Sequence, residues 1–129
     1  MPIFEAWDVV KVPFPYTDRP IRQWRPALVV AAEELQLRHG LLWLLMITSA
    51  ENRRWPGDVV VSDLAVAGLP AESVVRTAKI ATIDAAAAEQ LGSLPLADRE
   101  AVEGFVFSRL ARALGPYLME PPVERWKSP

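Results

Sequence analysis

Few side chains in this sequence can serve as an acid, a base or a nucleophile. The chain has no cysteine and a single histidine, His39, in the turn-like stretch Arg38-His39-Gly40. Thiolate catalysis and disulfides are therefore excluded, and a zinc ion would have only one imidazole and scattered carboxylates as ligands. We expect neither a metal nor another cofactor. The chemistry is left to arginines and hydroxyl groups.

Two loop-like stretches combine arginines with aromatic side chains. This combination follows a phosphate backbone and stacks a base when a protein binds single-stranded nucleic acid. The alternative is a solvated loop whose tryptophan packs onto the domain. The residues are Tyr16, Arg22 and Trp24 in the first stretch and Arg53, Arg54 and Trp55 in the second. We expect a local basic surface there, although the net charge of −2 argues against broad electrostatic binding to nucleic acid.

One arginine and two hydroxyl groups stand at the ends of apolar runs. Arg25 opens the run 26–32, and Thr48 and Ser49 follow the run 41–47. By position alone, Arg25 is most simply a solvated or ion-paired side chain, and a hydroxyl after a strand can bond to nearby backbone. The functional alternative is phosphate binding, since a guanidinium matches phosphate geometry with its planar fork and a hydroxyl can donate to a phosphate oxygen.

Five short strands are expected to position these residues. β-branched and apolar residues form the runs, and prolines, glycines and polar residues bound them. The run 41–47 shows no alternation, as expected for a strand covered on both faces. The expected strands cover residues 8–14, 25–32, 41–47, 58–61 and 74–83. Strands followed by helices indicate an α+β, mainly β domain, and short strands of this number usually curl into a small barrel.

Two helices are expected after the strands. Asp84 is placed to cap a short alanine-rich helix that ends at Gly92. A longer helix covers about 97–114, with apolar residues at three-and-four spacing and Gly115-Pro116 as its stop. Its apolar stripe contains Val102, Phe105, Val106, Leu110, Ala113 and Leu114.

The acidic residues of this last helix, Asp98, Glu100 and Glu103, are interpreted as its solvated face. We place one domain at residues 1–115 and expect residues 116–129 to form a tail that is mobile or lies on the surface. The N-terminus shows no basic segment followed by an apolar one, and the longest apolar run is too short to cross a bilayer. We therefore expect a cytoplasmic protein with no membrane partner.

Four stretches of the sequence occur in a specific order. They are WDVVKVPFPYTDR at 7–19, WRPALVVA at 24–31, MITSA at 46–50 and GLPAESVVRTAKIATID at 68–84. VPFPYTD followed at this separation by RPALVV is hard to obtain by chance, whereas ITS or GLP alone would mean little. In this order the four stretches resemble the MazF/PemK/Kid toxins of type II toxin–antitoxin systems.

The resemblance implies a small SH3-like barrel of the CcdB/PemK type with a C-terminal helix. It also implies a homodimer, a cognate antitoxin as protein partner, and metal-independent cleavage of single-stranded RNA at a short sequence. Without a metal to activate water, attack would come from the 2′-hydroxyl of the RNA itself. The protein would then be an endoribonuclease.

In members of this family the arginine of the RPA motif and the threonine after the third strand form the active site. These residues are Arg25 and Thr48 here, with Ser49 as a second candidate hydroxyl. Some relatives also use an arginine and an aspartate in the VVR-x-D stretch. This sequence has Arg76 at the arginine position but Ala78 at the aspartate position. The resemblance therefore does not identify the residue that would act as the general base. Lys79, in the same stretch, is a further expected RNA contact.

Two other functions stay open. A barrel of the same fold can be a toxin that poisons a topoisomerase without being an enzyme, although such relatives lack the RPALVV stretch and end in apolar residues unlike ERWKSP. The second alternative is an RNA-binding regulator that has lost catalysis, which Ala78 and the acidic net charge favour. A cleavage assay separates both alternatives from a nuclease.

Overall fold

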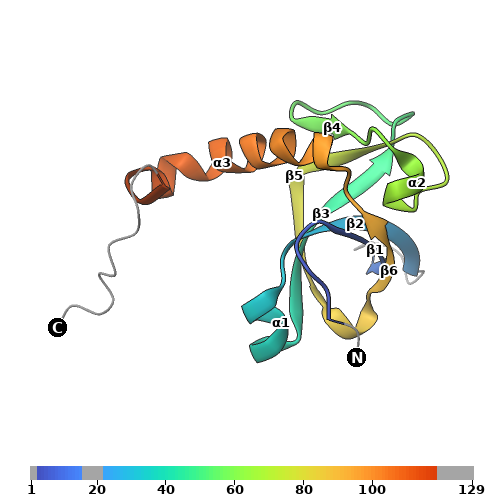
Figure 1. The fold of residues 1–129 in the computed structure, drawn as a ribbon, viewed down its shortest axis with the longest axis horizontal. Coiled ribbons are helices and arrows are strands. Elements are labelled where there is room, and N and C mark those ends of the chain that lie inside the picture. The colour runs from blue at the N-terminus through green and yellow to red at the C-terminus, as the bar shows by residue number, and fades with distance from the viewer. Residues whose placement is uncertain (1–2, 16–21, 119–129) are drawn as a thin grey trace.

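The fold is a strongly curled antiparallel sheet with a long helix at its end (Figure 1). The computed structural model describes residues 3–15 and 22–118. Six strands form one sheet in the order β4-β5-β3-β2-β1-β6. Their bounds are β1 Asp8–Pro15, β2 Arg22–Ala31, β3 Leu41–Ser49, β4 Asp58–Val60, β5 Ser73–Asp84 and β6 Glu89–Ser93. The α+β, mainly β class and the small-barrel architecture with a C-terminal helix are thereby confirmed.

β3 lies at the centre of the sheet because it is apolar on both faces. It pairs with β2 on one side and with β5 on the other. Leu42, Leu44 and Met46 belong to one buried cluster, whereas Leu45 and Ile47 belong to the cluster on the opposite face. Alternate residues of a strand point to opposite faces. The run without alternation is thus the strand between two cores, as the sequence predicts.

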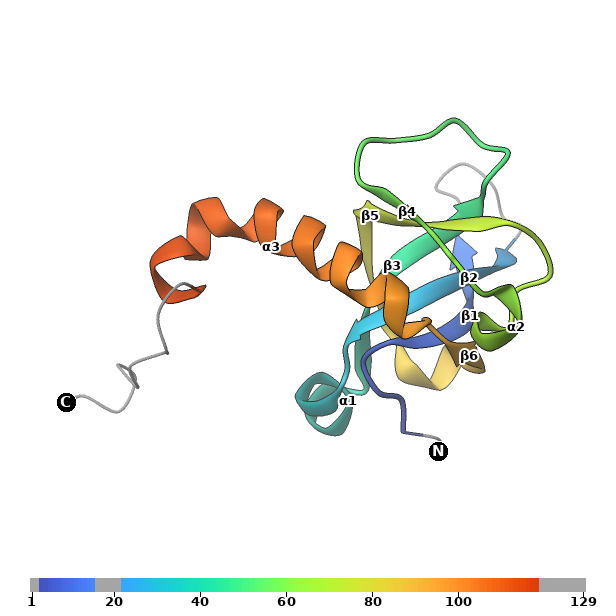
Figure 2. The same ribbon diagram turned by 45° about the horizontal axis from the view of Figure 1, so that its top comes forward.

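Three helices accompany the sheet. α1 (Glu33–His39) ends at Gly40, whose φ of 66° is the left-handed conformation that glycine adopts without strain. α2 (Leu64–Ala67) begins at Asp63, whose side chain accepts from two backbone N–H groups. α3 (Leu96–Leu118) contacts β4 and β5 near its start and then extends away from the sheet, as both views show (Figures 1 and 2). In the described part of the chain, no helix has the length and apolarity needed to cross a membrane.

Two sequence-based expectations about helices are wrong. The predicted helix from Asp84 to Gly92 is a 3₁₀ turn, η1 (Ala85–Ala87), followed by strand β6. Asp84 makes no capping hydrogen bond. Pairing of β6 with β1 decides the outcome, because cross-strand hydrogen bonds and packing outweigh a modest alanine helix preference. The sequence also predicts a turn at 38–40, where the structure has the end of α1 and its C-cap Gly40.

α3 also differs from the expectation in two respects. It continues through Gly115 and Pro116 to Leu118, so 116–118 are not part of a tail, and 119–129 lie outside the described residues. Pro116 cannot donate to the carbonyl four residues before it, and the helix ends two residues later. Asp98 is buried rather than solvated, because it accepts hydrogen bonds from Ser62 N–H at 2.8 Å and Ser62 Oγ at 3.0 Å. It ties the start of α3 to the segment after β4.

A buried ion pair joins β4, β5 and the loop that precedes β4. Arg76 of β5 donates from Nη2 to Oδ2 of Asp58 at 3.1 Å and from Nε to Oδ1 at 3.3 Å. The same Nη2 donates to the Arg53 carbonyl at 2.7 Å. The guanidinium lies 4.1 Å from the centre of the Trp55 ring, within cation–π range. We call this set, Arg76, Asp58, Trp55 and the Arg53 carbonyl, the loop clamp.

The loop clamp keeps Asp58 ionised. Burial alone would raise the pKa of Asp58, since only 2% of its side chain is exposed. The hydrogen bonds from Arg76 and from Trp55 N–H, together with the charges of Arg76 and Arg54, outweigh burial and hold the pKa below its ordinary value. The pair therefore stabilises the fold wherever Asp58 would also be ionised in the unfolded chain.

We expect Asp58→Ala to lower the free energy of unfolding by about 3 kcal/mol at pH 7, because it leaves the Arg76 guanidinium buried without a carboxylate. The pKa of Asp58 is lowered in the fold, so its contribution is complete above the ordinary value of about 4 and is lost as the pH falls through the lower folded value. Urea unfolding at several pH values measures both effects. The matched control is Asp84→Ala, an exposed carboxylate that caps nothing, with an expected change under about 0.5 kcal/mol. Equal losses in the two variants would contradict the role given to the ion pair.

Candidate active site

Strand register brings the two central candidate residues together. β2 and β3 pair with Ala27 opposite Met46 and Leu28 opposite Leu45. Extending this register by two residues along each strand sets Arg25 across from Thr48. Residues opposite each other in an antiparallel pair point to the same face. Arg25 and Thr48 thus share one face at the end of the sheet where β2 begins and β3 ends, and both are half-buried.

The core below this position is apolar and closed. Ala27 and Met46, the next residues on the same face, are fully or nearly fully buried, and so is Val12, the β1 residue opposite Arg25. A guanidinium at this position keeps its stem against apolar side chains while its head points toward solvent. Its Nη2 donates to Gln23 Oε1 at 3.4 Å, a long and exposed hydrogen bond.

A tight turn after β3 surrounds Thr48. The N–H of Asn52 donates to the Ser49 carbonyl at 3.1 Å, and the N–H of Glu51 donates to Ser49 Oγ at 3.2 Å. Nδ2 of Asn52 reaches back to Thr48 Oγ1 at 2.6 Å. Ser49 itself pairs with Ser73 on β5 and points to the opposite face from Thr48. Of the two hydroxyl groups expected at the site, only that of Thr48 lies on the face of Arg25.

The loop 50–57 carries the exposed Arg53, Arg54 and Trp55 between fixed ends. Ala50 N–H donates to the Glu72 carbonyl at 2.9 Å, and Thr77 Oγ1 donates to the Gly57 carbonyl at 2.8 Å. Gly57 adopts a φ of 92°, a conformation that disfavours any residue with a Cβ. The loop clamp fixes the middle of the loop through the Arg53 carbonyl. One face of Trp55 is covered by Arg76, yet 41% of the residue stays exposed for a further contact.

Arg76 is committed to the loop clamp. The sequence suggests it as a catalytic or phosphate-binding side chain, but its guanidinium is buried and already bonded to Asp58 and to the Arg53 carbonyl. Its Nε and Nη2 already donate to Asp58 and to the Arg53 carbonyl, so a phosphate would compete with a buried ion pair for this guanidinium. Arg76 lies one row inward from Thr48 on the same face, since it pairs with Met46. Its direct effect is on the loop that bears Arg53 and Trp55.

Trp24 lies apart from Arg25, and Lys79 lies in a bulge of β5. Trp24 neighbours Arg25 along β2 and so points to the opposite face, where Lys11 Nζ lies 5.6 Å from its ring centre and the residue is 55% exposed. Lys79 is exposed in a bulge, because the pairing of β5 with β3 jumps from Arg76 to Ile80. Ala78 occupies the same bulge. Tyr16 lies outside the described residues, and for Arg22 only its place at the start of β2 is described.

Two residues that matter to the site were not anticipated from the sequence. Asn52 contacts Thr48 across a turn and Asp58 contacts Arg76 across the β4–β5 pairing, and neither contact can be read from residue order. An asparagine four residues after a threonine in a polar, turn-forming segment was the one available indication. In the part of the chain that the structure describes, no three histidine, aspartate or glutamate side chains cluster in a way that could hold a metal ion.

Comparison with known proteins identifies the fold and the family. Residues 5–106 match the family model of the PemK-like, MazF-like toxin of type II toxin–antitoxin systems. A comparison with curated proteins gives no match.

Several solved structures have a similar fold, and the similarity covers nearly the whole length of each of those chains. A MazE–MazF complex from Deinococcus radiodurans is similar at 26% identity and a TM-score of 0.66, covering 85% of this chain and 97% of that one. MazF from the same organism has 24% identity and a TM-score of 0.69, with coverage of 86% and 99%. An endoribonuclease bound to its cognate antitoxin, from a mycobacterial species, has 15% identity and a TM-score of 0.65, with coverage of 86% and 96%.

The two sequence motifs and the strand pairing that joins them lie within the matched region, which spans most of the chain. The chain belongs to the family of PemK-like and MazF-like toxins of type II toxin–antitoxin systems.

Proposed function

We propose that this protein is an endoribonuclease that cleaves single-stranded RNA in the cytoplasm without a metal. The observation that carries the proposal is the placement of Arg25 and Thr48 on one face, at adjoining ends of β2 and β3. Family membership supports it, as does the likeness in fold to a mycobacterial endoribonuclease. The loop 50–57, with its exposed arginines and tryptophan, gives the RNA strand a second contact region.

The chemistry follows from what these side chains can do. Arg25 is always charged and a poor base, so it binds the phosphate and stabilises the charge that builds on its oxygens in the transition state. The hydroxyl of Thr48 donates to a non-bridging oxygen of the same phosphate. The 2′-hydroxyl of the RNA gives up its proton to water and attacks the phosphorus. The bond to the 5′-oxygen breaks, and that oxygen takes up a proton from water as it leaves. The products are a 2′,3′-cyclic phosphate and a 5′-hydroxyl.

We expect Arg25→Ala to slow cleavage about 10²-fold or more, the scale for losing one preorganised charge-stabilising donor. Arg25→Lys should recover little because an ammonium lacks the fork. Thr48→Val should cost about tenfold, as for one neutral hydrogen bond. Gel assays with end-labelled RNA in excess chelator measure these rates and identify the termini. Cleavage of an RNA with a 2′-deoxy nucleotide before the scissile bond would exclude this mechanism, and RNA binding without cleavage would favour a regulatory barrel.

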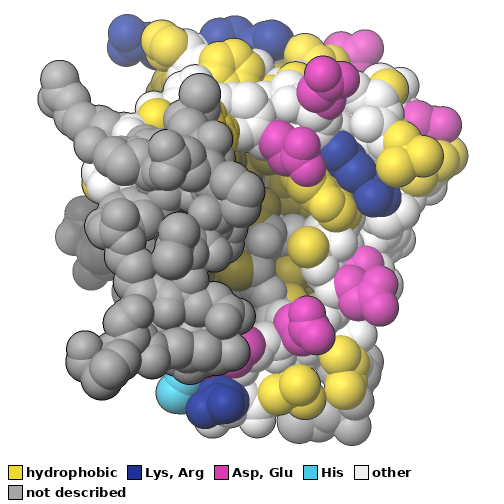
Figure 3. All heavy atoms as spheres, turned by 60° about the vertical axis from the view of Figure 1, so that its left-hand side comes forward, with side chains coloured by type: hydrophobic (Ala, Val, Ile, Leu, Met, Phe, Trp, Pro, Cys, Tyr) yellow, Lys and Arg dark blue, Asp and Glu magenta, His cyan; other side chains and the backbone are white. Residues whose placement is uncertain are grey.

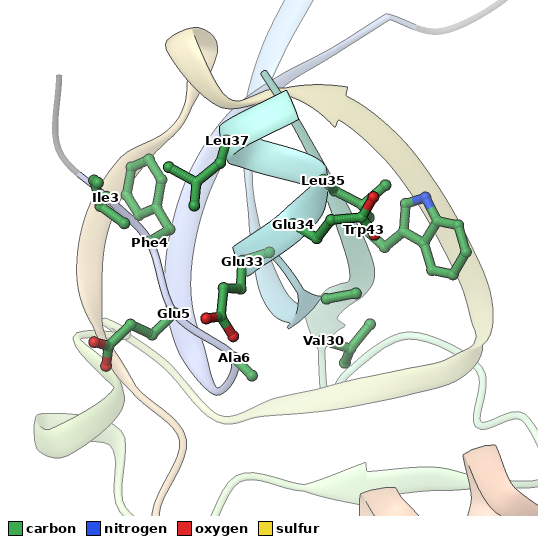
Figure 4. Close-up of a pocket in the computed structure, with 12 residues that line it drawn as sticks. Ile3, Phe4, Glu5, Ala6, Val30, Glu33, Glu34, Leu35, Leu37 and Trp43 are labelled. Atoms are coloured by element: carbon green, nitrogen blue, oxygen red, sulfur yellow. The ribbon is translucent and has the colours of Figure 1, made fainter. Parts of the chain in front are cut away.

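We further propose that the protein forms a homodimer through the apolar surface between α1, β2, β3 and α3. A hollow of about 940 Å³ includes Val30, Leu37 and Trp43 in its lining (Figure 4), and a hollow of about 390 Å³ is lined by Val30, Phe107 and other residues of α3. Val30 lines both, so the two hollows lie next to each other. Hydrophobic side chains lie in the hollow of this side of the molecule (Figure 3). Contiguous apolar surface of this kind usually marks an interface.

Light scattering at micromolar concentration should give twice the mass of one chain. Trp43→Glu places a charge on the surface of β3, where Trp43 is 45% exposed, so it should yield a folded monomer. Leu96→Glu is the matched control, because Leu96 is 79% exposed and lies outside both hollows. A monomeric unaltered protein, or a dimer unaffected by Trp43→Glu, would refute this interface.

The proposed antitoxin partner inhibits by covering the arginine-bearing loops. A disordered, acidic segment that folds on binding would pair with Arg25, Arg53 and Arg54 on the surface that RNA uses. An acidic peptide from the cognate antitoxin should therefore compete with a 2′-deoxy-substituted RNA oligonucleotide for the protein, as measured by fluorescence anisotropy. Simultaneous binding of peptide and RNA would contradict a shared site.

A further inference from the structure

We propose that Asn52 is a positioning residue that sets the hydroxyl of Thr48 as a hydrogen-bond donor to the scissile phosphate. The inference rests on the proposed RNA cleavage and adds a residue to it. Its starting observation is the 2.6 Å contact from Asn52 Nδ2 to Thr48 Oγ1. Neither the family motifs nor the spacing of charged residues pointed to Asn52.

The turn after β3 fixes the place of the asparagine. Asn52 N–H bonds to the Ser49 carbonyl, Glu51 N–H bonds to Ser49 Oγ, and Ala50 N–H bonds to the carbonyl of Glu72 before β5. These bonds close the chain into a turn directly after β3, so the side chain four residues beyond Thr48 returns to it. Ala50 is anchored to a different part of the sheet, which ties the turn to the barrel.

The direction of the hydrogen bond gives Asn52 its role. A threonine hydroxyl carries one hydrogen and two lone pairs. When Nδ2 donates to Oγ1, one lone pair is used and the hydrogen stays available. Phosphate oxygens only accept, so a hydroxyl that binds them must donate. Without Asn52, the hydroxyl can turn its hydrogen to a nearby backbone carbonyl, as threonines in turns commonly do. Asn52 thus holds Thr48 in the state that the reaction needs.

An aspartate at the same position gives the sharpest test. It has nearly the same shape, but its carboxylate only accepts, so it would take the hydrogen of Thr48 and turn the hydroxyl away from the phosphate. Asn52→Asp should therefore impair cleavage more than Asn52→Ala. The added negative charge near RNA also weakens binding, and the Thr48→Val background separates this effect because no hydroxyl remains to be oriented there.

The experiment is a double-mutant cycle of single-turnover cleavage rates at saturating RNA, with unfolding midpoints to show that each variant folds. We expect Asn52→Ala to lower the rate about threefold to tenfold with Thr48 present, as for one hydrogen bond, and by less than about twofold in Thr48→Val. In the free protein, the side-chain amide resonance of Asn52 should shift in Thr48→Val.

Four outcomes would overturn the inference. Equal effects of Asn52→Ala with and without Thr48 would show that Asn52 acts by itself, for example by touching RNA. An Asn52→Asp variant as active as Asn52→Ala would show that the direction of the bond does not matter. Cleavage by the unaltered protein with full activity in Asn52→Ala would reject Asn52 while leaving the nuclease intact. If the unaltered protein cleaves no RNA, both the proposed function and the role of Asn52 are wrong.

Discussion

The pairing of β3 with β2 and β5 is the interaction on which the rest of the structure depends. β3 is buried on both faces, so its register cannot slip by one residue without turning every side chain to the wrong core. This pairing sets Arg76 across from Met46, and the alternation of side chains along β2 and β3 puts Arg25 and Thr48 on one face. The candidate active site is therefore a consequence of how the centre of the sheet packs.

The loop clamp shows how the same scaffold uses a second arginine. Arg76 forms an ion pair with Asp58 and a cation–π contact with Trp55. These contacts hold the loop 50–57 beside the site. Two arginines on the same face thus have different surroundings, since Arg25 is half-buried at the edge of the core and Arg76 is buried in the loop clamp. Ala78, at the position of the family aspartate, lies in the neighbouring bulge, so this chain has no carboxylate there to act as a base.

The parts of the fold that were predicted correctly from the sequence are those with strong local patterns. All five predicted strands are present in the structure. They could be predicted because prolines and turns bound runs of β-branched residues, and the central strand could be predicted from its lack of alternation. β6 was missed because its alanine-rich surroundings favour a helix until β1 offers a partner. Asp98 was taken for a surface charge because its partner, Ser62, is far away in the sequence.

The residues of the candidate site also fall into two groups, those that a sequence motif predicts and those that only the fold brings together. Arg25 and Thr48 stand in recognisable motifs, whereas the contacts of Asn52 and Asp58 depend on turn geometry and strand register. Neighbouring residues also separate in space, since Trp24 and Arg25 point to opposite faces of β2. The sequence order therefore predicts an aromatic side chain, Trp24, beside Arg25 at the site, whereas the structure places it on the other face of the sheet.

The most direct test of the account is a crystal structure of the protein with a short RNA carrying a 2′-deoxy nucleotide before the scissile bond, which binds without being cut. The account predicts that the phosphate after this nucleotide lies within about 3 Å of both the Arg25 guanidinium and Thr48 Oγ1, on the face they share. A phosphate bound on the opposite face, beside Trp24 and Lys11, or held by Arg53 and Arg54 alone, would contradict it.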